Sequence, residues 1–238
     1  MTENPAITAE DRLKAKIYFY NSIAGQFDSR MNMYDAKKRI VVFFDELLGH
    51  EQLRGKKLLD AGCGTGWFSK AAVERGALVT SFDIGENLLA EVKKKCESNR
   101  VLGSVLEMPF ASDSFDYIVS SEVIEHVVEP YTAIREMFRV LKPGGLMILS
   151  TPNKIWKWTL FVANLFNLRP YQGLENWSGW RQLKKELLAS GFEIEKMEGI
   201  HLVPFVHPLT YPVNNFFHRF NSALGPLMVN IAVRCKKK

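Results

Sequence analysis

The sequence has few cysteines and no long apolar run. Its 238 residues include only Cys63, Cys96 and Cys235, too few for the disulfide framework of a small exported protein. The longest strongly apolar stretch, residues 158–168, contains two asparagines and is shorter than the roughly 20 residues that span a bilayer. The first twelve residues, MTENPAITAEDR, lack the basic and apolar segments of an export signal. We therefore expect a cytoplasmic protein without a transmembrane helix.

Low-complexity tracts and fixed-period repeats are also absent, which excludes disordered, fibrous and solenoid classes. Apolar residues make up 47% of the chain and charged residues 24%, as in ordinary globular proteins. This length is enough for one α/β domain with a large core. We expect a single domain over residues 1–238, with residues 1–34 as an N-terminal lead-in.

The last forty residues contain no aspartate or glutamate. Residues 1–198 carry 26 basic and 26 acidic side chains, so the net charge of +5 comes from Arg219, Arg234 and three C-terminal lysines. Such a terminus could face an anionic substrate, an acidic lipid surface or nucleic acid, although a charged end is most often only solvated. Charge does not decide among these.

From Lys56 onward, short apolar runs alternate with helical stretches. The runs cover residues 56–62, 78–84, 101–110, 115–123, 144–152, 191–197 and 226–235. A helix is expected over 35–48, capped by Asp35 and stopped by Gly49, and another over 178–189. Alternating strands and helices with near-continuous apolar strands indicate a parallel sheet covered on both faces.

Two aromatic stretches interrupt this alternation. Residues 153–177, after the fifth strand, and residues 203–226, between the sixth and seventh, are long for connections inside a compact domain. Such segments are usually lids or binding loops. Residues 154–166 in particular predict an amphipathic helix with lysines near its start, which together with the acid-free stretch after Glu198 could form an apolar lid with a basic rim. The alternative is that their rings pack on the body of the protein.

The strongest local signal is residues 58–66, LLDAGCGTG, an apolar strand running into a glycine-rich turn. Glycines there let the backbone approach a ligand, with amides at a helix N-terminus. A nicotinamide fingerprint requires glycine where Trp67 stands, and no Gly-Lys-Ser/Thr of a P-loop follows. Asp83, 23 residues after Asp60, ends the next strand, where it can accept both hydroxyls of a ribose. The site suits a nucleoside without a pyrophosphate.

These motifs, together with residues 106–110 (LEMPF), 114–116 (SFD) and 141–145 (LKPGG), resemble the class I S-adenosylmethionine-dependent methyltransferases over residues 35–200. Residues 122–127 (EVIEHV) and 150–153 (STPN) look most like the ubiquinone- and menaquinone-biosynthesis methyltransferases. Enzymes that methylate small lipophilic or sugar-linked acceptors share much of this pattern. The resemblance implies a Rossmann-like, mostly parallel seven-stranded sheet whose last strand, around 227–235, is antiparallel.

The resemblance also implies S-adenosylmethionine as cofactor and assigns residues to it. Asp60 braces the turn or merely caps it, and Ser104 stands where the family usually has an aspartate that bonds the adenine. Arg39 aligns with a cofactor-contacting arginine, although a solvated arginine fits nearly as well. The implied cofactor-binding residues are Arg39, Asp60, Gly62, Gly64, Gly66, Asp83, Ile84, Ser104, Val105 and Ser121.

Glu122, Glu125 and His126 have the spacing i, i+3, i+4. If a helix starts at the end of the fourth strand, all three face the reactive methyl group. His126, assisted by Glu122, is then the candidate base for a hydroxyl acceptor. The carboxylates could hold a divalent cation, but such clusters more often bond one another, so no metal is assigned.

The other histidines give weaker signals. His201 and His207 could line the acceptor pocket, whereas His218 is expected to pack or lie on the surface; His-x5-His separated by prolines does not predict a metal site.

We therefore expect a methyltransferase acting on a small or lipophilic, quinone-precursor-like acceptor, by O- or C-methylation, with transient contact to a membrane surface. One alternative is a cofactor-binding partner protein without turnover. Another is an RNA or DNA methyltransferase, but Ser150–Asn153 lacks the Asn/Asp-Pro-Pro-aromatic run that grips a flipped base. No nucleic acid partner is expected.

Overall fold

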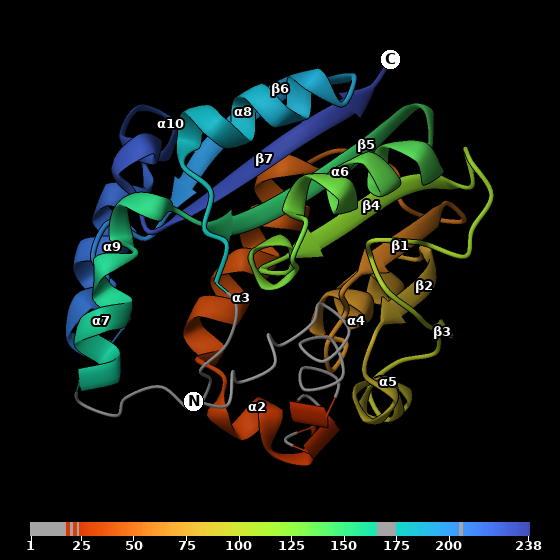
Figure 1. The fold of residues 1–238 in the computed structure, drawn as a ribbon, viewed down its shortest axis with the longest axis horizontal. Coiled ribbons are helices and arrows are strands. Elements are labelled where there is room, and N and C mark those ends of the chain that lie inside the picture. Colours follow the sequence, from red (N-terminus) through yellow and green to blue (C-terminus); the bar gives the residue numbers. More distant parts are fainter. Residues whose placement is uncertain (1–17, 20, 23, 166–174, 205–206) are drawn as a thin grey trace, which may run out of the picture.

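A seven-stranded sheet forms the centre of the molecule (Figure 1). The computed structural model describes residues 18–165 except 20 and 23, residues 175–204 and residues 207–238. The strands, in the spatial order β3-β2-β1-β4-β5-β7-β6, are β1 (Lys57–Ala61), β2 (Leu78–Asp83), β3 (Asn99–Leu102), β4 (Phe115–Ser121), β5 (Leu141–Pro152), β6 (Phe192–Ile200) and β7 (Asn230–Lys237). Strands β1 to β5 run parallel, and β7 pairs antiparallel with both β5 and β6. The expected fold class is confirmed.

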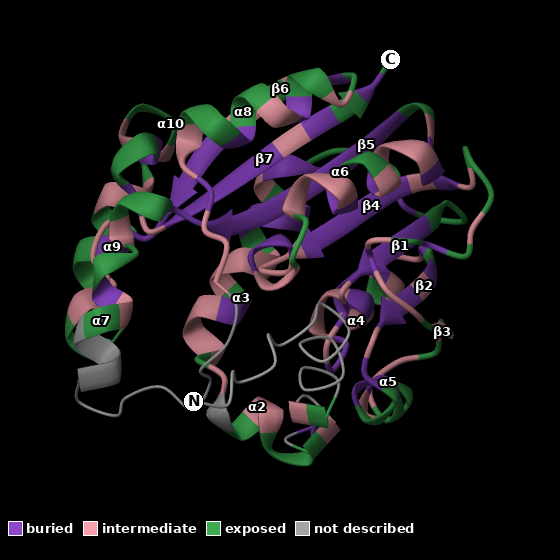
Figure 2. Cartoon of the chain, viewed as in Figure 1, coloured by how far each residue is buried: buried purple, intermediate pink, exposed green. Residues whose placement is uncertain are grey.

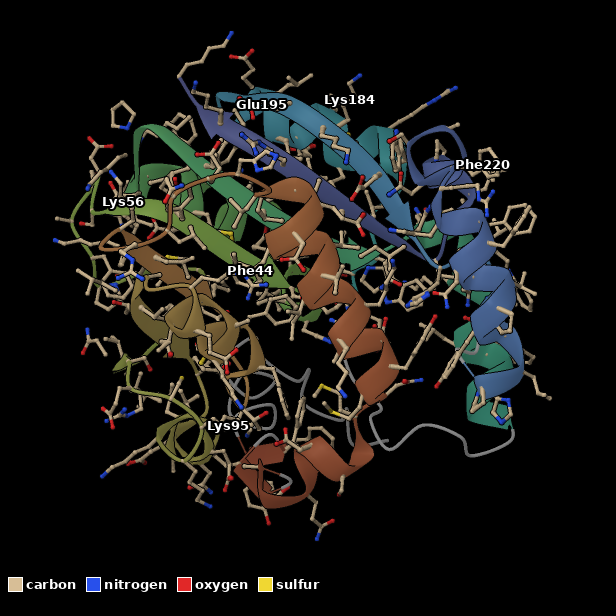
Figure 3. The ribbon with its side chains drawn as sticks, turned by 180° about the vertical axis from the view of Figure 1, so that it is seen from behind. Phe44, Lys56, Lys95, Lys184, Glu195 and Phe220 are labelled. Carbon is tan, nitrogen blue, oxygen red and sulfur yellow. The ribbon has the colours of Figure 1, made fainter. Side chains whose placement is uncertain are left out.

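Helices cover both faces of the sheet (Figure 1). One face carries α6 (Pro130–Val140) and α8 (Trp180–Ala189). The other carries α3 (Met33–Val41) with its π-helical continuation η2 (Val42–Leu47), and α4 (Trp67–Glu74). Three further elements lie at the β2–β3 end of the molecule. They are the short η1 (Ala24–Gln26) and α2 (Phe27–Arg30), and α5 (Glu86–Lys93). Figure 3 shows α3 and η2, with Phe44 labelled, crossing the rear face of the sheet.

The central strands are apolar because both of their faces are buried (Figure 2). Successive side chains of a strand point to opposite faces. Leu59 accordingly packs in the cluster under α6 and α8, and its neighbour Leu58 packs in the cluster under η2 and α4. The same division holds for Met147 and Ile148 of β5.

The first long helix begins earlier than its sequence suggested. Asn32, not Asp35, is the N-cap of α3, and its side chain accepts the backbone N–H groups of Tyr34 and Asp35. The prediction of Asp35 as the cap is therefore wrong. Its carboxylate instead accepts hydrogen bonds from Arg39, one turn later on α3, and from the distant His201. The end at Gly49, which has a φ of +59°, is confirmed.

Both aromatic stretches form helices beyond the carboxyl end of β5 (Figure 1). The first contains η4 (Lys154–Trp156) and α7 (Trp158–Leu165), so a helix occupies the predicted region, with Phe166 outside the described residues. The second contains η5 (Pro208–Thr210), α9 (Tyr211–His218), α10 (Asn221–Leu224) and η6 (Gly225–Leu227). The indole N–H of Trp156 donates to the carbonyl of Leu227, which ties the two stretches together. Residues 1–17 of the predicted lead-in, 166–174 and 205–206 also lie outside the described residues.

The basic C-terminus is a sheet strand and not a free tail. Arg234 pairs with Glu51 and Glu195, and Lys237 pairs with Asp113. In the antiparallel register, Lys236 lies opposite Leu146 and Asn230 opposite Pro152, so the terminal lysines lie at the amino edge of the sheet. The terminal lysines are therefore distant from the aromatic helices, whereas Lys154 in η4 and Arg219 at the end of α9 lie on them. Among the described residues, no helix has the length and apolarity to cross a membrane.

Candidate active site

The glycine-rich turn follows β1, where the strand order reverses between β1 and β4. The backbone N–H groups of Gly62 and Cys63 both donate to the carbonyl of Phe82, which fixes the turn against β2. Gly62, Gly64 and Gly66 all have positive φ angles, which favour glycine. Cys63 is buried, as expected of a small packing residue.

The glycines of this turn have different neighbours. A Cβ atom at Gly62 would lie 2.4 Å from Cγ2 of Val123, so this position has no room for a side chain. A Cβ at Gly64 would meet nothing within 4 Å. The backbone at Gly64 thus borders open space at the carboxyl edge of the sheet, as a turn that admits a ligand requires.

Asp83 fixes the turn from the neighbouring strand. Its Oδ2 accepts the N–H of Gly64 at 2.8 Å, and its Oδ1 accepts the N–H of Gly85 at 2.9 Å. The amide of Gly64 is therefore directed at Asp83. Each carboxylate oxygen can accept further hydrogen bonds, which suits recognition of neighbouring hydroxyl groups.

Asp60 supports the turn from the interior of the protein. Its Oδ2 accepts the hydroxyl of Ser69 on α4 at 2.6 Å, and Ser69 also contacts the hydroxyl of Ser81 on β2. Burial raises the pKa of Asp60 to about 7. The carboxyl group joins β1, β2 and α4 in the interior.

Ile84, Ser104 and Val105 follow the ends of β2 and β3, which are adjacent strands. Ile84 is half-buried and Val105 is buried. The hydroxyl oxygen of Ser104 accepts the N–H of Leu106 at 3.2 Å, so its proton stays available for donation. The structure thus brings these residues to the edge that carries Asp83.

Arg39 connects the N-terminal helix to the end of β4. Its Nη1 donates to the hydroxyl of Ser121 at 2.9 Å, and its Nη2 donates to Oδ2 of Asp35 at 2.7 Å. A solvated role for Arg39 is thus wrong, because the guanidinium is held between two elements.

The network continues across the carboxyl end of β5 and the amino end of the antiparallel β7. Ser121 contacts Ser150, whose hydroxyl donates to Oε1 of Glu122 at 2.7 Å. Asn230 donates to the other oxygen of Glu122 at 2.8 Å. Burial raises the pKa of Glu122, while Arg39 opposes this shift. Glu122 is therefore held by fixed donors on two strands.

The helix expected after β4 does not form. Glu122 has a φ of +57°, and only the short η3 (Ile124–His126) follows. Glu125 is nevertheless buried, and its Oε2 accepts the hydroxyl of Thr151 at 3.3 Å. His126 Nε2 lies 3.8 Å from Oε1 of Glu125. Burial and the nearby Glu122 raise the pKa of Glu125 well above its usual range. Within the described ranges, no group of three His, Cys, Asp or Glu side chains is arranged to hold a metal ion.

Two contacts escaped the sequence reasoning. Asp35 accepts from His201, 166 residues away, at 3.0 Å. Asp28 on α2 accepts the hydroxyl of Thr65 in the glycine-rich turn. No local signal reveals either pair, because each partner lies on a different element.

His207 and His218 have structural partners. His207 is exposed and accepts the N–H of Leu209 as a cap of η5, and His218 contacts the carboxylate of Glu46. The packing role expected of His218 agrees with this contact.

Comparison with known proteins agrees with this architecture. The family model described as a methyltransferase domain matches residues 59–149. The ubiquinone biosynthesis O-methyltransferase of Pseudomonas fluorescens is 39% identical over 139 residues, which cover 55% of this chain and 57% of that protein. The enzyme of the same name from Pseudomonas savastanoi pathovar phaseolicola is 34% identical over 163 residues, which cover 63% and 68%. The chain thus spans somewhat more than half the length of the first of these relatives.

Solved structures share the fold. An S-adenosylmethionine-dependent methyltransferase from Mesorhizobium loti has a TM-score of 0.61 at 19% identity, covering 79% of this chain and 93% of that one. The magnesium protoporphyrin IX methyltransferase of Synechocystis, solved with S-adenosylhomocysteine, has a TM-score of 0.62 at 18% identity, covering 86% and 84%.

The chain therefore belongs to the class I S-adenosylmethionine-dependent methyltransferases, and S-adenosylmethionine is its cofactor. Within this class its sequence is similar to the ubiquinone biosynthesis O-methyltransferases. The open space at Gly64 and the carboxylate of Asp83 beside it are compatible with a nucleoside ligand.

Proposed function

We propose that this protein transfers the methyl group of S-adenosylmethionine to a hydroxyl oxygen of a small, lipophilic acceptor that resembles a quinone precursor. The observation that carries the proposal is the similarity to enzymes named ubiquinone biosynthesis O-methyltransferase. The buried polar network over the ends of β4, β5 and β7 supports it, because such a network can orient a hydroxyl group next to the cofactor turn.

The proposed cofactor residues lie after the carboxyl ends of β1, β2, β3 and β4, and Arg39 reaches them from α3. The glycine-rich turn gives its backbone to the methionine part, and Asp83 accepts the ribose hydroxyls. Ile84, Ser104 and Val105 would border the adenine. The bound cofactor supplies an already activated methyl group, so the protein mainly has to align the acceptor and exclude water. Arg39 and Ser121 would line the cofactor, and His126 with Glu122 is the proton acceptor expected from the sequence.

Exposed aromatic side chains suggest how a lipophilic acceptor is received. Trp158 and Phe161 on α7 are 56% and 73% exposed. Phe216 on α9 and Phe220, the N-cap of α10, are also exposed, and Arg219 lies over the ring of Phe216 at 4.5 Å. Phe220 is labelled in Figure 3. An apolar surface beyond the carboxyl edge of the sheet suits an acceptor with a hydrocarbon chain and permits transient contact with a membrane surface.

The proposed compartment is the cytoplasm. Cys63, Cys96 and Cys235 are all free thiols, as in proteins of a reducing compartment.

A methyl-transfer screen tests this function. Cofactor with a labelled methyl group is offered with a prenylated catechol, the same catechol without its chain, a sugar nucleotide and tRNA. We expect transfer to oxygen of the catechols, with a lower KM for the prenylated one. Transfer only to tRNA or only to carbon would contradict the proposal. Tight cofactor binding without transfer to any acceptor would favour a non-catalytic partner.

A further inference from the structure

The ring of His201 is fixed at the carboxyl edge of the sheet. His201 directly follows β6, which runs parallel to β5 because β7 is antiparallel to both. Its side chain is 2% exposed, and its φ of +58° is unusual for a residue with a side chain. The backbone is held there because its carbonyl accepts the N–H of Val229 at 2.8 Å. Residues held in such conformations cluster at functional sites.

Asp35 determines which nitrogen of this ring carries the proton. Nε2 lies 3.0 Å from Oδ1 of Asp35, whose other oxygen accepts from Arg39. Burial opposes ionisation of Asp35, but Arg39 and His201 outweigh it and lower its pKa to about 2. Asp35 is therefore a carboxylate near neutral pH and needs a donor. In a neutral imidazole only one nitrogen carries a proton, so Nε2 donates and Nδ1 is the acceptor.

Nδ1 is available for a ligand. It makes no hydrogen bond to any residue within the described part of the chain. The ring of Tyr34 lies 5.8 Å from the imidazole and stacks on Tyr211 at 3.5 Å, which gives an aromatic wall beside it. An aromatic acceptor can pack on such a wall.

His201 is also connected to the cofactor side of the site. Asp35 joins it to Arg39, and Arg39 reaches Ser121 at the end of β4, the strand next to β1. An acceptor held beside His201 is thus on the edge that bears the glycine-rich turn.

A protonated imidazole at His201 faces the carboxylate of Asp35, which stays charged near neutral pH. The alternative base is His126, which lies beside Glu125, whose buried carboxyl group favours the neutral form. Among the described residues, the titratable groups around His201 include Asp35, Tyr34 and Arg39 on α3 and Tyr211 on α9. Glu122 also interacts with Arg39.

We propose that His201 is the base that removes the hydroxyl proton of the acceptor, with Asp35 orienting its ring. This rests on the proposed O-methylation. The acceptor proton moves to Nδ1 as the oxygen attacks the methyl carbon. The bond from that carbon to sulfur breaks, its electron pair stays on sulfur, and the products are a methyl ether and S-adenosylhomocysteine. The imidazolium then returns the proton to water.

The decisive variant is His201→Asn, because asparagine tolerates a positive φ. We expect kcat to fall about 100-fold or more on catechol, with the Kd of S-adenosylhomocysteine within about twofold of the wild type. On 4-nitrocatechol we expect a much smaller fall in kcat, because its more acidic hydroxyl needs less help from a base. The limb of the kcat/KM pH profile that reports the base should disappear on catechol. His50→Asn, which changes an exposed histidine in the turn after η2, is the matched control and should retain activity.

The possible outcomes distinguish the proposed O-methylation from the proposed role of His201. If the wild type methylates neither catechol, the proposed O-methylation is wrong, and the proposed role of His201 as base is wrong as well. If the wild type is active and His201→Asn loses equally on both catechols, or binds S-adenosylhomocysteine poorly, His201 is structural and the base proposal is wrong. If His126→Asn alone shows the acceptor-dependent loss, His126 is the base.

The tautomer provides a readout without turnover. Nitrogen-15 NMR of labelled histidines, with His201→Asn to assign the signals, should show that the neutral imidazole of His201 is protonated at Nε2 and bare at Nδ1. Asp35→Asn should change the populations of the two tautomers. The opposite tautomer in the wild type would overturn the proposal.

Discussion

Asp28 accepts a hydrogen bond from the hydroxyl of Thr65, which lies 37 residues later in the glycine-rich turn. The same carboxylate accepts the indole N–H of Trp67 and pairs with Lys95 at 2.8 Å. Figure 3 labels Lys95 at the place where α5 approaches the N-terminal segment. The segment η1–α2 is thereby fastened over the turn.

Asp28→Asn should weaken cofactor binding although Asp28 need not touch the cofactor. The variant loses charge-assisted hydrogen bonds of roughly 1.5–3 kcal/mol, so we expect a Kd for S-adenosylhomocysteine at least about 10-fold higher. Calorimetry measures it. The control is Asp45→Asn, which removes an exposed pair with Arg75 elsewhere. Equal affinities for both variants and the wild type would show that the segment does not stabilise the turn.

Substitutions at Gly62 and Gly64 should separate folding from binding. At Gly64 an added Cβ meets open space, so Gly64→Ala should cost only the roughly 1–2 kcal/mol of a left-handed backbone while abolishing cofactor binding. At Gly62 the Cβ meets Val123, so Gly62→Ala should add overpacking of roughly 1–3 kcal/mol. Thermal unfolding and calorimetry measure the two effects. Gly62→Ala combined with Val123→Ala should recover part of the lost stability. A normal affinity in Gly64→Ala would contradict the placement of the cofactor.

The sequence was informative where the signal is local. The turn after β1, Asp60 and Asp83 lie within 26 residues of one another, and their motif follows from what a strand, a glycine turn and a helix require. The alternation of apolar runs likewise predicted the parallel strands, because burial on both faces determines their composition. These parts of the fold and of the site were therefore accessible before any coordinates.

Contacts between residues far apart in the chain could not be predicted from the sequence. The pairs Asp35–His201 and Glu122–Asn230 join residues 166 and 108 positions apart. The positive φ of Glu122 broke a helix that the spacing of Glu122, Glu125 and His126 had suggested. The partners of the C-terminal charges could not be predicted either, because pairing with Glu51, Glu195 and Asp113 depends on where β7 enters the sheet.

Asp60 should make the protein less stable at high pH. Its pKa is about 7 in the folded state against an ordinary 3.8. Since the pKa of Asp60 is higher in the folded state than in the unfolded state, its contribution to the free energy of unfolding is complete below about pH 4. This contribution is lost as the pH rises to about 7. Three pKa units correspond to on the order of 4 kcal/mol. Asp60→Asn, which keeps an acceptor for Ser69, should show less loss of unfolding free energy between pH 4 and pH 8 in urea titrations. A parallel pH dependence in variant and wild type would contradict the shift.

Asp83→Ala should weaken cofactor binding by removing a ribose acceptor. The loss of a charge-assisted hydrogen bond corresponds to roughly 1.5–3 kcal/mol. Because Asp83 also holds Gly64 and Gly85, the variant is compared with an analogue of S-adenosylhomocysteine that lacks a ribose hydroxyl. The wild type should bind this analogue more weakly than S-adenosylhomocysteine. Asp83→Ala should bind the two ligands with nearly equal affinity. Additive losses in the calorimetry would mean that Asp83 acts only on the turn.

The aromatic residues of α7 should affect the acceptor and not the cofactor. Trp156 is bonded to Leu227, so its removal would disturb the fold, whereas Trp158 and Phe161 are exposed. Replacing these two by serine should raise the KM for a prenylated catechol and leave the KM for the unprenylated one unchanged, because only the apolar surface is removed. Leu78→Ser, an exposed apolar residue at the amino end of β2, is the matched control. Co-sedimentation with liposomes, with and without anionic lipid, measures membrane contact independently and should decrease for the double variant. An equal KM change for both catechols would place these rings outside the path of the hydrocarbon chain.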